Sequence, residues 1–170
     1  RWRDTAVYLD GLPISFLSFG ELPVALAPTW VPVKVDAERR PGTQDPTWRW
    51  SKERYYKFTD YLRALGVEPR TVKELHVSGP KAAEALIVTG RDLTSPRAAG
   101  FMFRFGAMVR GKAIPQVPDD FGNGRTPDKI GSVMIYVTKP PPTLVRNVGF
   151  HLDGKLVAGV PYLGEAPRGG

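Results

Sequence analysis

The sequence predicts a single α+β domain with a mixed, mainly antiparallel β-sheet and one or two short helices. The 17 prolines and 18 glycines divide the chain into short segments, a composition that disfavours a helical bundle. Asp-Gly stands between short apolar runs near both ends, and it is a strong hairpin signal because glycine adopts positive φ without steric cost. A chain of 170 residues is also long enough to bury a core of its own.

Each Asp-Gly dipeptide predicts its own hairpin. We expect the first to join strands at residues 5–9 and 14–17, and the second to form a terminal hairpin over residues 148–158. We interpret the repeated Leu-Asp-Gly as convergence on one turn type rather than as duplication, because no repeat of solenoid period is present.

The segment after the first hairpin predicts an edge strand and a loop. Residues 30–35 are expected to form a short strand, and Pro32 marks an edge or a bulge because it has no N–H to donate. Residues 36–47 are polar and rich in proline and glycine, which predicts a long surface loop. This loop is too short for a linker, so residues 1–170 are assigned to one domain.

The middle of the chain predicts a helix and two strands. Thr59 is suited to cap a helix over residues 59–65, and Gly66 is suited to end it. Residues 72–77 alternate as a half-buried strand does. Residues 85–89 form a continuous apolar run, which is typical of a strand covered on both faces.

The later sequence predicts the centre of the sheet. Phe101, Phe103 and Phe105 share one face of a strand. Residues 133–137 are apolar on both faces and rich in β-branched types, which predicts the central strand. Residues 139–142 contain three prolines and are expected to be extended.

Composition limits the chemistry open to this chain. It contains no cysteine, which excludes disulfides, thiolate nucleophiles and cysteine-ligated metal centres. The net charge of +7 and the pI of about 9.8 favour solubility and permit an anionic partner surface. No apolar run is long enough for a transmembrane segment. The chain begins at Arg1 rather than methionine, and we expect a processed, extracytoplasmic protein.

Motifs of catalysis and cofactor binding are missing from the sequence. Neither G-x-S-x-G nor a glycine-rich phosphate loop occurs. His76 and His151 lie far apart in the sequence, so we predict no metal site and no cofactor. His76 shares its strand face with Glu74 and Ser78, and we expect a surface or hydrogen-bonded histidine.

A polar loop over residues 118–128 supplies one set of candidate functional residues. A calcium loop of the EF-hand type is excluded because Phe121 and Ile130 would occupy ligand positions. A structural role is favoured over a functional one. The candidates in this loop are Asp119, Asp120, Asn123 and Arg125.

Residues 48–58 combine aromatic and cationic side chains more densely than any other segment. One interpretation is an aromatic strand that enters a helix, with cationic stems covering the rings. A protein or membrane interface is the second, and nucleic-acid binding is the third. The residues assigned to a partner-binding surface are Trp48, Arg49, Trp50, Arg54 and Tyr55.

The order of elements resembles the molybdopterin-binding fold of sulfite-oxidase-type oxidoreductases over about three quarters of the chain. The matching pieces are the hairpin Leu9-Asp10-Gly11-Leu12-Pro13-Ile14, the turn Leu22-Pro23, the helix at 59–67, and the segments 72–78, 114–118 and 130–137. Each piece is generic. In that family a cysteine thiolate ligates molybdenum, and this chain has none. The resemblance therefore implies the fold without its metal chemistry, and no catalytic residue is carried over.

Together these observations predict a non-catalytic binding or assembly module, as a subunit or accessory domain of a larger extracytoplasmic complex. The partner expected is a protein. One alternative is an enzyme, either of the molybdopterin-oxidoreductase fold or a hydrolase of unrecognised type. The third hypothesis is nucleic-acid binding through the basic aromatic segment.

Overall fold

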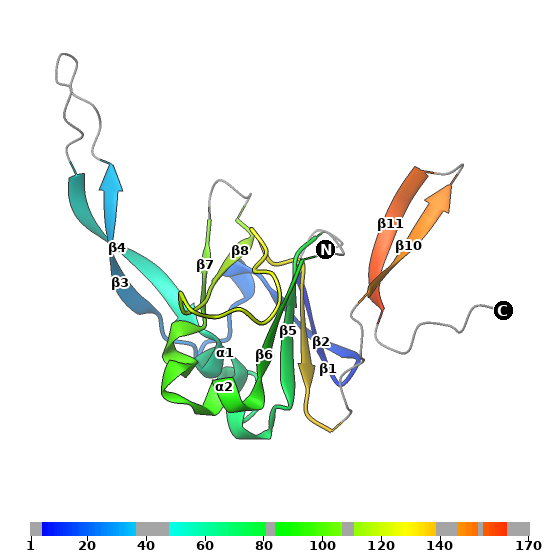
Figure 1. Cartoon of the computed structure of the whole chain (residues 1–170), viewed down its shortest axis with the longest axis horizontal. Coiled ribbons are helices and arrows are strands. Elements are labelled where there is room, and N and C mark those ends of the chain that lie inside the picture. The colour runs from blue at the N-terminus through cyan, green and yellow to red at the C-terminus, as the bar shows by residue number, and fades with distance from the viewer. Residues whose placement is uncertain are drawn as a thin grey trace, which may run out of the picture.

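A computed structural model describes residues 5–36, 48–80, 84–106, 111–138, 146–152 and 155–162. These residues form a five-stranded sheet in the order β2-β1-β9-β5-β6, a four-stranded sheet in the order β3-β4-β7-β8, and a two-stranded sheet of β10 and β11 (Figure 1). The strands are β1 (Thr5–Leu9), β2 (Leu12–Leu17), β3 (Thr29–Asp36), β4 (Trp48–Lys57), β5 (Glu74–Ser78), β6 (Ala85–Thr89), β7 (Met102–Phe105), β8 (Ala113–Gln116), β9 (Ser132–Tyr136), β10 (Arg146–Leu152) and β11 (Lys155–Tyr162). The helices are α1 (Phe58–Ala64) and α2 (Gly90–Thr94). The predicted α+β class is confirmed: β1 and β9 pair in parallel, and the other strand pairs are antiparallel.

The first hairpin turns tightly at its Asp-Gly dipeptide. Leu9 pairs with Leu12, and Asp10 and Gly11 have φ angles of 47° and 86°. Positive φ at both central residues defines the two-residue turn that matches the twist of a hairpin. The second strand therefore begins at Leu12, two residues before the predicted start.

The Asp10 carboxylate ties this turn to the end of β9. It accepts hydrogen bonds from the backbone N–H of Val137 at 2.8 Å and of Thr138 at 3.2 Å. The Thr138 hydroxyl also donates to it, at 2.7 Å. These bonds satisfy backbone donors at the point where the strand leaves the sheet.

Strand β9 is the centre of the five-stranded sheet, as predicted. All five of its residues are buried, and it pairs with β1 on one side and with β5 on the other. The predicted range was displaced by one residue, because the strand begins at Ser132 and Val137 follows its end.

Two neighbouring strands differ from their predicted burial. Strand β5 was expected to be half-buried, but four of its five residues are buried because it lies between β9 and β6. Strand β6 was expected to be covered on both faces, yet it is the edge strand and its burial alternates along the chain. An apolar run does not reveal which strand stands at an edge.

Helix α1 differs in detail from its prediction. Helix α1 begins at Phe58 rather than Thr59, and its N-cap residue Lys57 makes no side-chain capping bond. Strand β4 runs directly into this helix, so the position of Phe58 in the core sets the boundary. Gly66 has a φ of 82° after the helix, as predicted. Helix α2 follows β6 directly, and its capping box joins Thr89 and Asp92.

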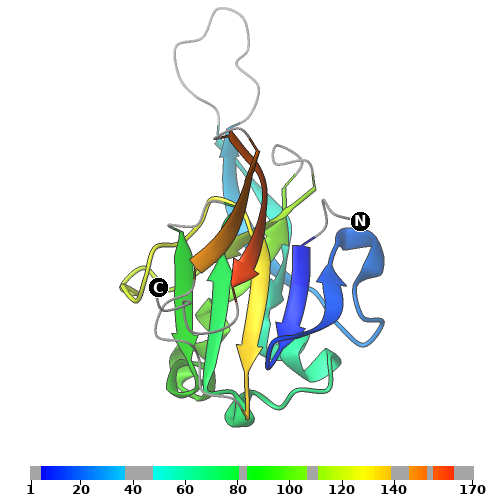
Figure 2. The same cartoon turned by 90° about the vertical axis from the view of Figure 1, so that its right-hand side faces the viewer.

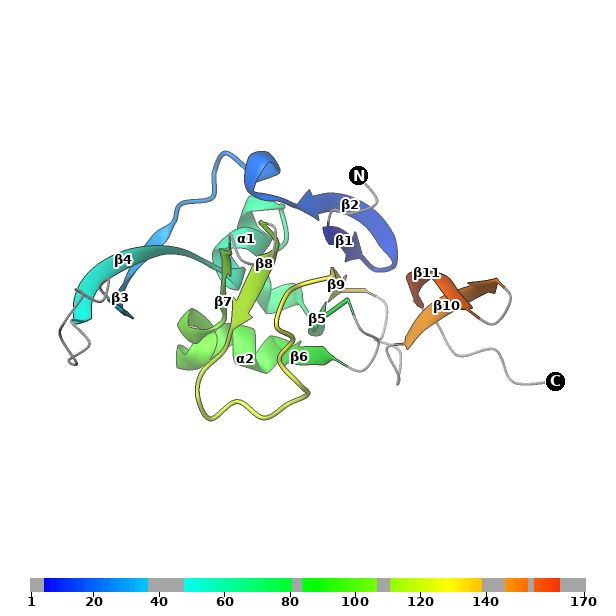
Figure 3. The ribbon, with the colours of Figure 1, turned by 90° about the horizontal axis from the view of Figure 1, so that it is seen from above.

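The hydrophobic core lies between one face of the five-stranded sheet and the helices. Figures 2 and 3 show the β10–β11 hairpin on the other side of that sheet. The terminal hairpin predicted over residues 148–158 is present and longer, with strands over 146–152 and 155–162. Of the loop predicted over residues 36–47, Asp36 ends β3 and residues 37–47 lie outside the described residues, as does the whole extended segment at 139–142. The largest apolar side chains of the core are Phe58, Tyr61, Leu62, Leu75, Leu86, Phe101, Phe103, Ile130 and Ile135.

Truncation of the central strand should be costly. We expect Ile135→Ala to lower the free energy of unfolding by about 2–5 kcal/mol, because Ile135 is 1% exposed and the substitution leaves a cavity. Urea denaturation measures the change. Val24→Ala is the matched control at a fully exposed apolar side chain and should change stability very little. A loss below about 1 kcal/mol for Ile135→Ala would contradict the central position of β9.

Candidate functional site

Strands β3 and β4 form an antiparallel ribbon that we call the arm. Eight consecutive pairs join the strands, from Thr29 opposite Tyr55 to Asp36 opposite Trp48. Figure 1 shows the far end of this ribbon reaching away from the helices and the five-stranded sheet. Because residues opposite each other in an antiparallel pair share a face, the register separates the arm's side chains into two sets.

One face of the arm is aromatic and cationic, and we call it the arm face. Its described residues are Trp30, Pro32 and Lys34 from β3, and Trp50, Lys52 and Arg54 from β4. All six are exposed, and the exposed fractions reach 56% for Trp30 and 73% for Trp50. These six residues carry three positive charges and no carboxylate. Large exposed rings beside cations are typical of surfaces that bind a partner.

Arg54 is held in place by two aromatic rings. Its guanidinium lies 5.4 Å from the centre of the Phe19 ring and 5.6 Å from that of the Trp30 ring. Such cation–π contacts contribute roughly 0.5–1 kcal/mol each at exposed sites. No carboxylate of the described part of the chain is within ion-pair distance of Arg54. Its planar fork of donors is therefore oriented and open to a carboxylate or phosphate.

A small groove opens at the base of the arm, beside Arg54. Its volume is about 220 Å³, and its lining residues are Phe19, Glu53, Arg54, Tyr56, Arg104 and Phe105. The Phe19 and Phe105 rings meet edge to face at 5.5 Å. Arg104 and Glu53 approach within 3.6 Å at the groove. Small-molecule sites usually measure about 300–1,000 Å³, so this groove is sized for one anchoring side chain.

The structure divides the five residues predicted for this surface. Trp50 and Arg54 lie on the arm face. Arg49 is exposed but belongs to the opposite face, since it pairs with Val35. Tyr55 is 6% exposed and also points to the opposite face, where its hydroxyl lies 3.4 Å from Glu53. The expectation that Tyr55 presents its ring to a partner is therefore wrong. Trp48 pairs with Asp36, and its side chain lies outside the described residues.

Half of this surface lies outside the segment 48–58 and was not predicted from the sequence. Trp30 and Lys34 come from β3, and Phe19 comes from the short 3₁₀ turn Phe19–Glu21. The alternation of Trp30, Pro32 and Lys34 with three valines was a readable signal. It needed the pairing of β3 with β4 to place those residues beside Arg54 and Trp50.

The polar loop over residues 118–128 serves the fold. The Asn123 carbonyl accepts from the Ile87 N–H, and the Arg125 N–H donates to the Ala85 carbonyl. Gly124 has a φ of 94°, and a Cβ there would lie 2.2 Å from the Ala85 carbonyl oxygen. The loop thus covers the edge of β6, as edge strands require. Asp119 is exposed, and Asp120 pairs with Arg97 at 2.8 Å, so the four candidates do not converge on one site.

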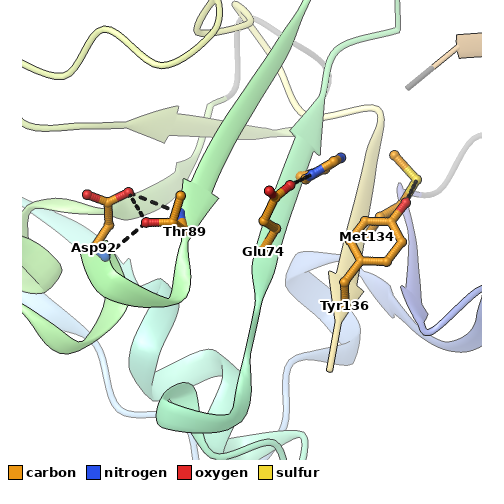
Figure 4. Close-up of polar contacts among 6 residues, drawn as sticks. Glu74, Thr89, Asp92, Met134 and Tyr136 are labelled. Carbon is orange, nitrogen blue, oxygen red and sulfur yellow. Dashed lines mark hydrogen bonds and ion pairs between the residues drawn. The ribbon is translucent and has the colours of Figure 1, made fainter. Parts of the chain in front are cut away.

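A second polar group lies on the outer face of the five-stranded sheet. His76 is 1% exposed, so the expectation of a surface histidine is wrong and that of a hydrogen-bonded one is confirmed. Its Nε2 lies 2.5 Å from a carboxylate oxygen of Glu74 (Figure 4). The His76 and Tyr136 rings meet at 4.9 Å, and the Tyr136 hydroxyl donates to the sulfur of Met134 at 3.7 Å. Among the described residues, no three histidine or acidic side chains are grouped to hold a metal ion.

Alkaline solution should weaken the fold through Tyr136. Burial, with a smaller contribution from Glu74, raises the pKa of Tyr136 to about 12. The Tyr136 hydroxyl loses its proton near pH 10 in the unfolded chain and near pH 12 in the folded chain. Its contribution to the free energy of unfolding is therefore complete below pH 10 and is lost as the pH rises from 10 to 12. The loss amounts to about 3 kcal/mol for two pKa units. Urea denaturation of Tyr136→Phe should show a shallower alkaline decline. An unchanged decline would contradict this assignment.

Comparisons with other proteins leave the family of this chain open. No protein family, curated protein or solved structure matches the chain. The resemblance to the sulfite-oxidase-type fold therefore stays a prediction. Within the described ranges, neither α1 nor α2 nor any 3₁₀ turn is long and apolar enough to cross a bilayer.

Proposed function

We propose that this chain is a non-catalytic binding module that holds an acidic, extended segment of a partner protein on the arm face. The observation that carries the proposal is the alternation of exposed tryptophan with lysine and arginine on one side of a projecting ribbon. Aromatic and arginine side chains dominate binding energy at interfaces because they bury large areas and still make polar contacts. Three positive charges on these six residues outnumber the one carboxylate that the register adds to this face, that of Asp36 opposite Trp48, and they favour an acidic partner.

The spacing of the rings favours a polypeptide over a nucleic acid. Trp30 and Trp50 lie on opposite strands, four register positions apart, which corresponds to about 13 Å along the ribbon. This distance matches side chains four residues apart in an extended peptide. Successive bases of a stacked strand are only about 3.4 Å apart, so the two rings do not form a stacking ladder.

The edge of the arm favours binding across its face rather than addition of a strand. Strand β3 is an edge strand, and Pro32 in its middle has no N–H to donate. A peptide added at that edge would lose a ladder hydrogen bond there. Side-chain contacts on the arm face, with one anchor in the groove beside Arg54, therefore supply the affinity. We place this module in an extracytoplasmic complex, for which the cysteine-free sequence is the support.

Loss of a positive charge from the arm face should weaken the binding of an acidic peptide, whereas loss of a positive charge from the opposite face should not. A fluorescein-labelled peptide of alternating glutamate and tyrosine is the probe, and fluorescence anisotropy measures its dissociation constant. We expect Arg54→Ala and Trp50→Ala each to weaken binding by about tenfold or more, the loss typical of central interface residues. Arg49→Ala removes the same charge from the other face and should change binding less than about twofold.

Two outcomes would contradict the proposal. Equal losses in Arg49→Ala and Arg54→Ala would show that net charge alone attracts the peptide. Tighter binding of single-stranded DNA than of the peptide, with the same dependence on Trp50 and Arg54 and a steep decline with salt, would assign the surface to nucleic acid. Circular dichroism of each variant confirms that it is folded.

A further inference from the structure

The two hairpins of this chain agree in far more than their turns. Adding 143 to each residue number of a β1–β2 pair gives a β10–β11 pair, from Leu9 opposite Leu12 to Thr5 opposite Leu17. All five pairs of the first hairpin recur in this way. The corresponding outer pairs in the second hairpin are Leu152 opposite Lys155 and Val148 opposite Val160.

The irregularity of the ladder also recurs at the same place. The register of the first hairpin shifts between Val7 and Tyr8, and that of the second shifts between Phe150 and His151. An Asp-Gly turn fixes the pairing next to it, but it does not require a shift two residues further along. Bulges are reproducible features of a fold rather than accidents. Convergence on a turn therefore does not account for the match.

The sequence after each hairpin continues the correspondence. Phe-Gly-Glu-Leu-Pro follows the first hairpin at residues 19–23, and Leu-Gly-Glu-Ala-Pro follows the second at residues 163–167. The offset there is 144, so one residue is inserted after the second hairpin. Residues 148–167 thus repeat residues 5–23, and the interpretation of the Leu-Asp-Gly pair as simple convergence is withdrawn.

The first copy shows what such a hairpin pairs with. The edge of β1 that faces away from β2 pairs in parallel with β9, and Asp10 accepts from the two backbone N–H groups that follow β9. In the second copy, β10 and β11 form a sheet of two strands within the described residues. An isolated two-stranded hairpin is at best marginally stable in water, and an open strand edge is a template for a further strand.

We propose that β10 docks a parallel strand of the β9 type, supplied by a second unit of this same fold. Strand β9 of the present unit already lies between β1 and β5, so the docked strand comes from another unit. The terminal hairpin is then the first hairpin of that unit, and Asp153 stands in the sequence position that corresponds to Asp10. This inference is independent of the arm face.

A graft within the full chain tests the equivalence of the hairpins. Residues 5–17 are replaced by the sequence of residues 148–160. Because Phe150 would then occupy the place of Val7, which is 0% exposed, a second graft carries Phe150→Val to avoid overpacking. We expect the second graft at least to unfold cooperatively, with the β9 amides protected from hydrogen exchange. A control graft keeps Asp-Gly and scrambles the other residues. Exchange in both grafts as fast as in the control would overturn the proposal.

An extended chain tests the partner itself. Residues 1–167 are followed directly by a second copy of residues 24–138, so that the terminal hairpin begins the added unit. Hydrogen exchange measured by mass spectrometry should show two protected copies of the β9 segment. With residues 148–160 scrambled except for Asp-Gly, only the first copy should be protected. If the β9 segment of the added copy exchanges rapidly in both chains, β10 does not pair with this strand.

Discussion

Burial of strand β9 on both faces is the constraint on which the rest of the fold depends. A strand with no access to water must pair its backbone groups along both edges, because each unpaired group would be desolvated without compensation. Strands β1 and β5 supply those pairs, one parallel and one antiparallel. The parallel pairing forces a long crossover between β1 and β9. Most of the chain, including the arm, both helices and strand β5, lies within that crossover.

The two faces of the central sheet have different characters. The inner face packs against the helices and carries the aliphatic core. The outer face carries His76, Met134 and Tyr136, and the polar groups among them make hydrogen bonds with near neighbours on the same face. The His76 Nε2 and Tyr136 hydroxyl avoid most of the desolvation penalty in this way, whereas the buried His76 Nδ1 has no hydrogen-bond partner among the described residues. The β10–β11 hairpin lies on that side of the sheet (Figure 2).

The arm combines a rigid base with an exposed tip. Strand β4 leaves the core at Tyr56, which stacks on Phe103 at 5.5 Å, and its far half pairs only with β3. Side chains near the base are therefore held by packing, whereas Trp50 has one strand neighbour and solvent. On the proposed binding surface, Arg54 is therefore held by two rings near the base, and Trp50 is exposed farther out. Because Arg54 already lies against the Phe19 and Trp30 rings, it has less conformational freedom to lose when a partner binds.

Local chemistry in the sequence determined several features of this protein. The first Asp-Gly turn, the buried character of residues 133–136 and the β-rich α+β class all follow from side-chain types within a few residues of one another. The concentration of aromatic and cationic residues over 48–58 can likewise be seen in the sequence, and it is the basis of the proposed partner surface. Each of these signals is short-range, and for that reason it could be read without knowledge of the fold.

Only the tertiary structure decided which segments meet. Alternation along β4 separates Arg54 from Tyr55, yet the sequence does not say which face packs on the core. Both Tyr55 and Tyr56 are buried at the base of the arm, where the neighbouring strand β7 pairs with β4 at Tyr56 and Lys57. The apolar run of β6 predicts a strand covered on both faces, but β6 is an edge strand because a loop, residues 118–128, lies beside it. The site joins Trp30 and Phe19 to Arg54 through pairing and packing over 24 and 35 residues of sequence. Long-range pairing fixes these relations, and residue type alone does not encode them.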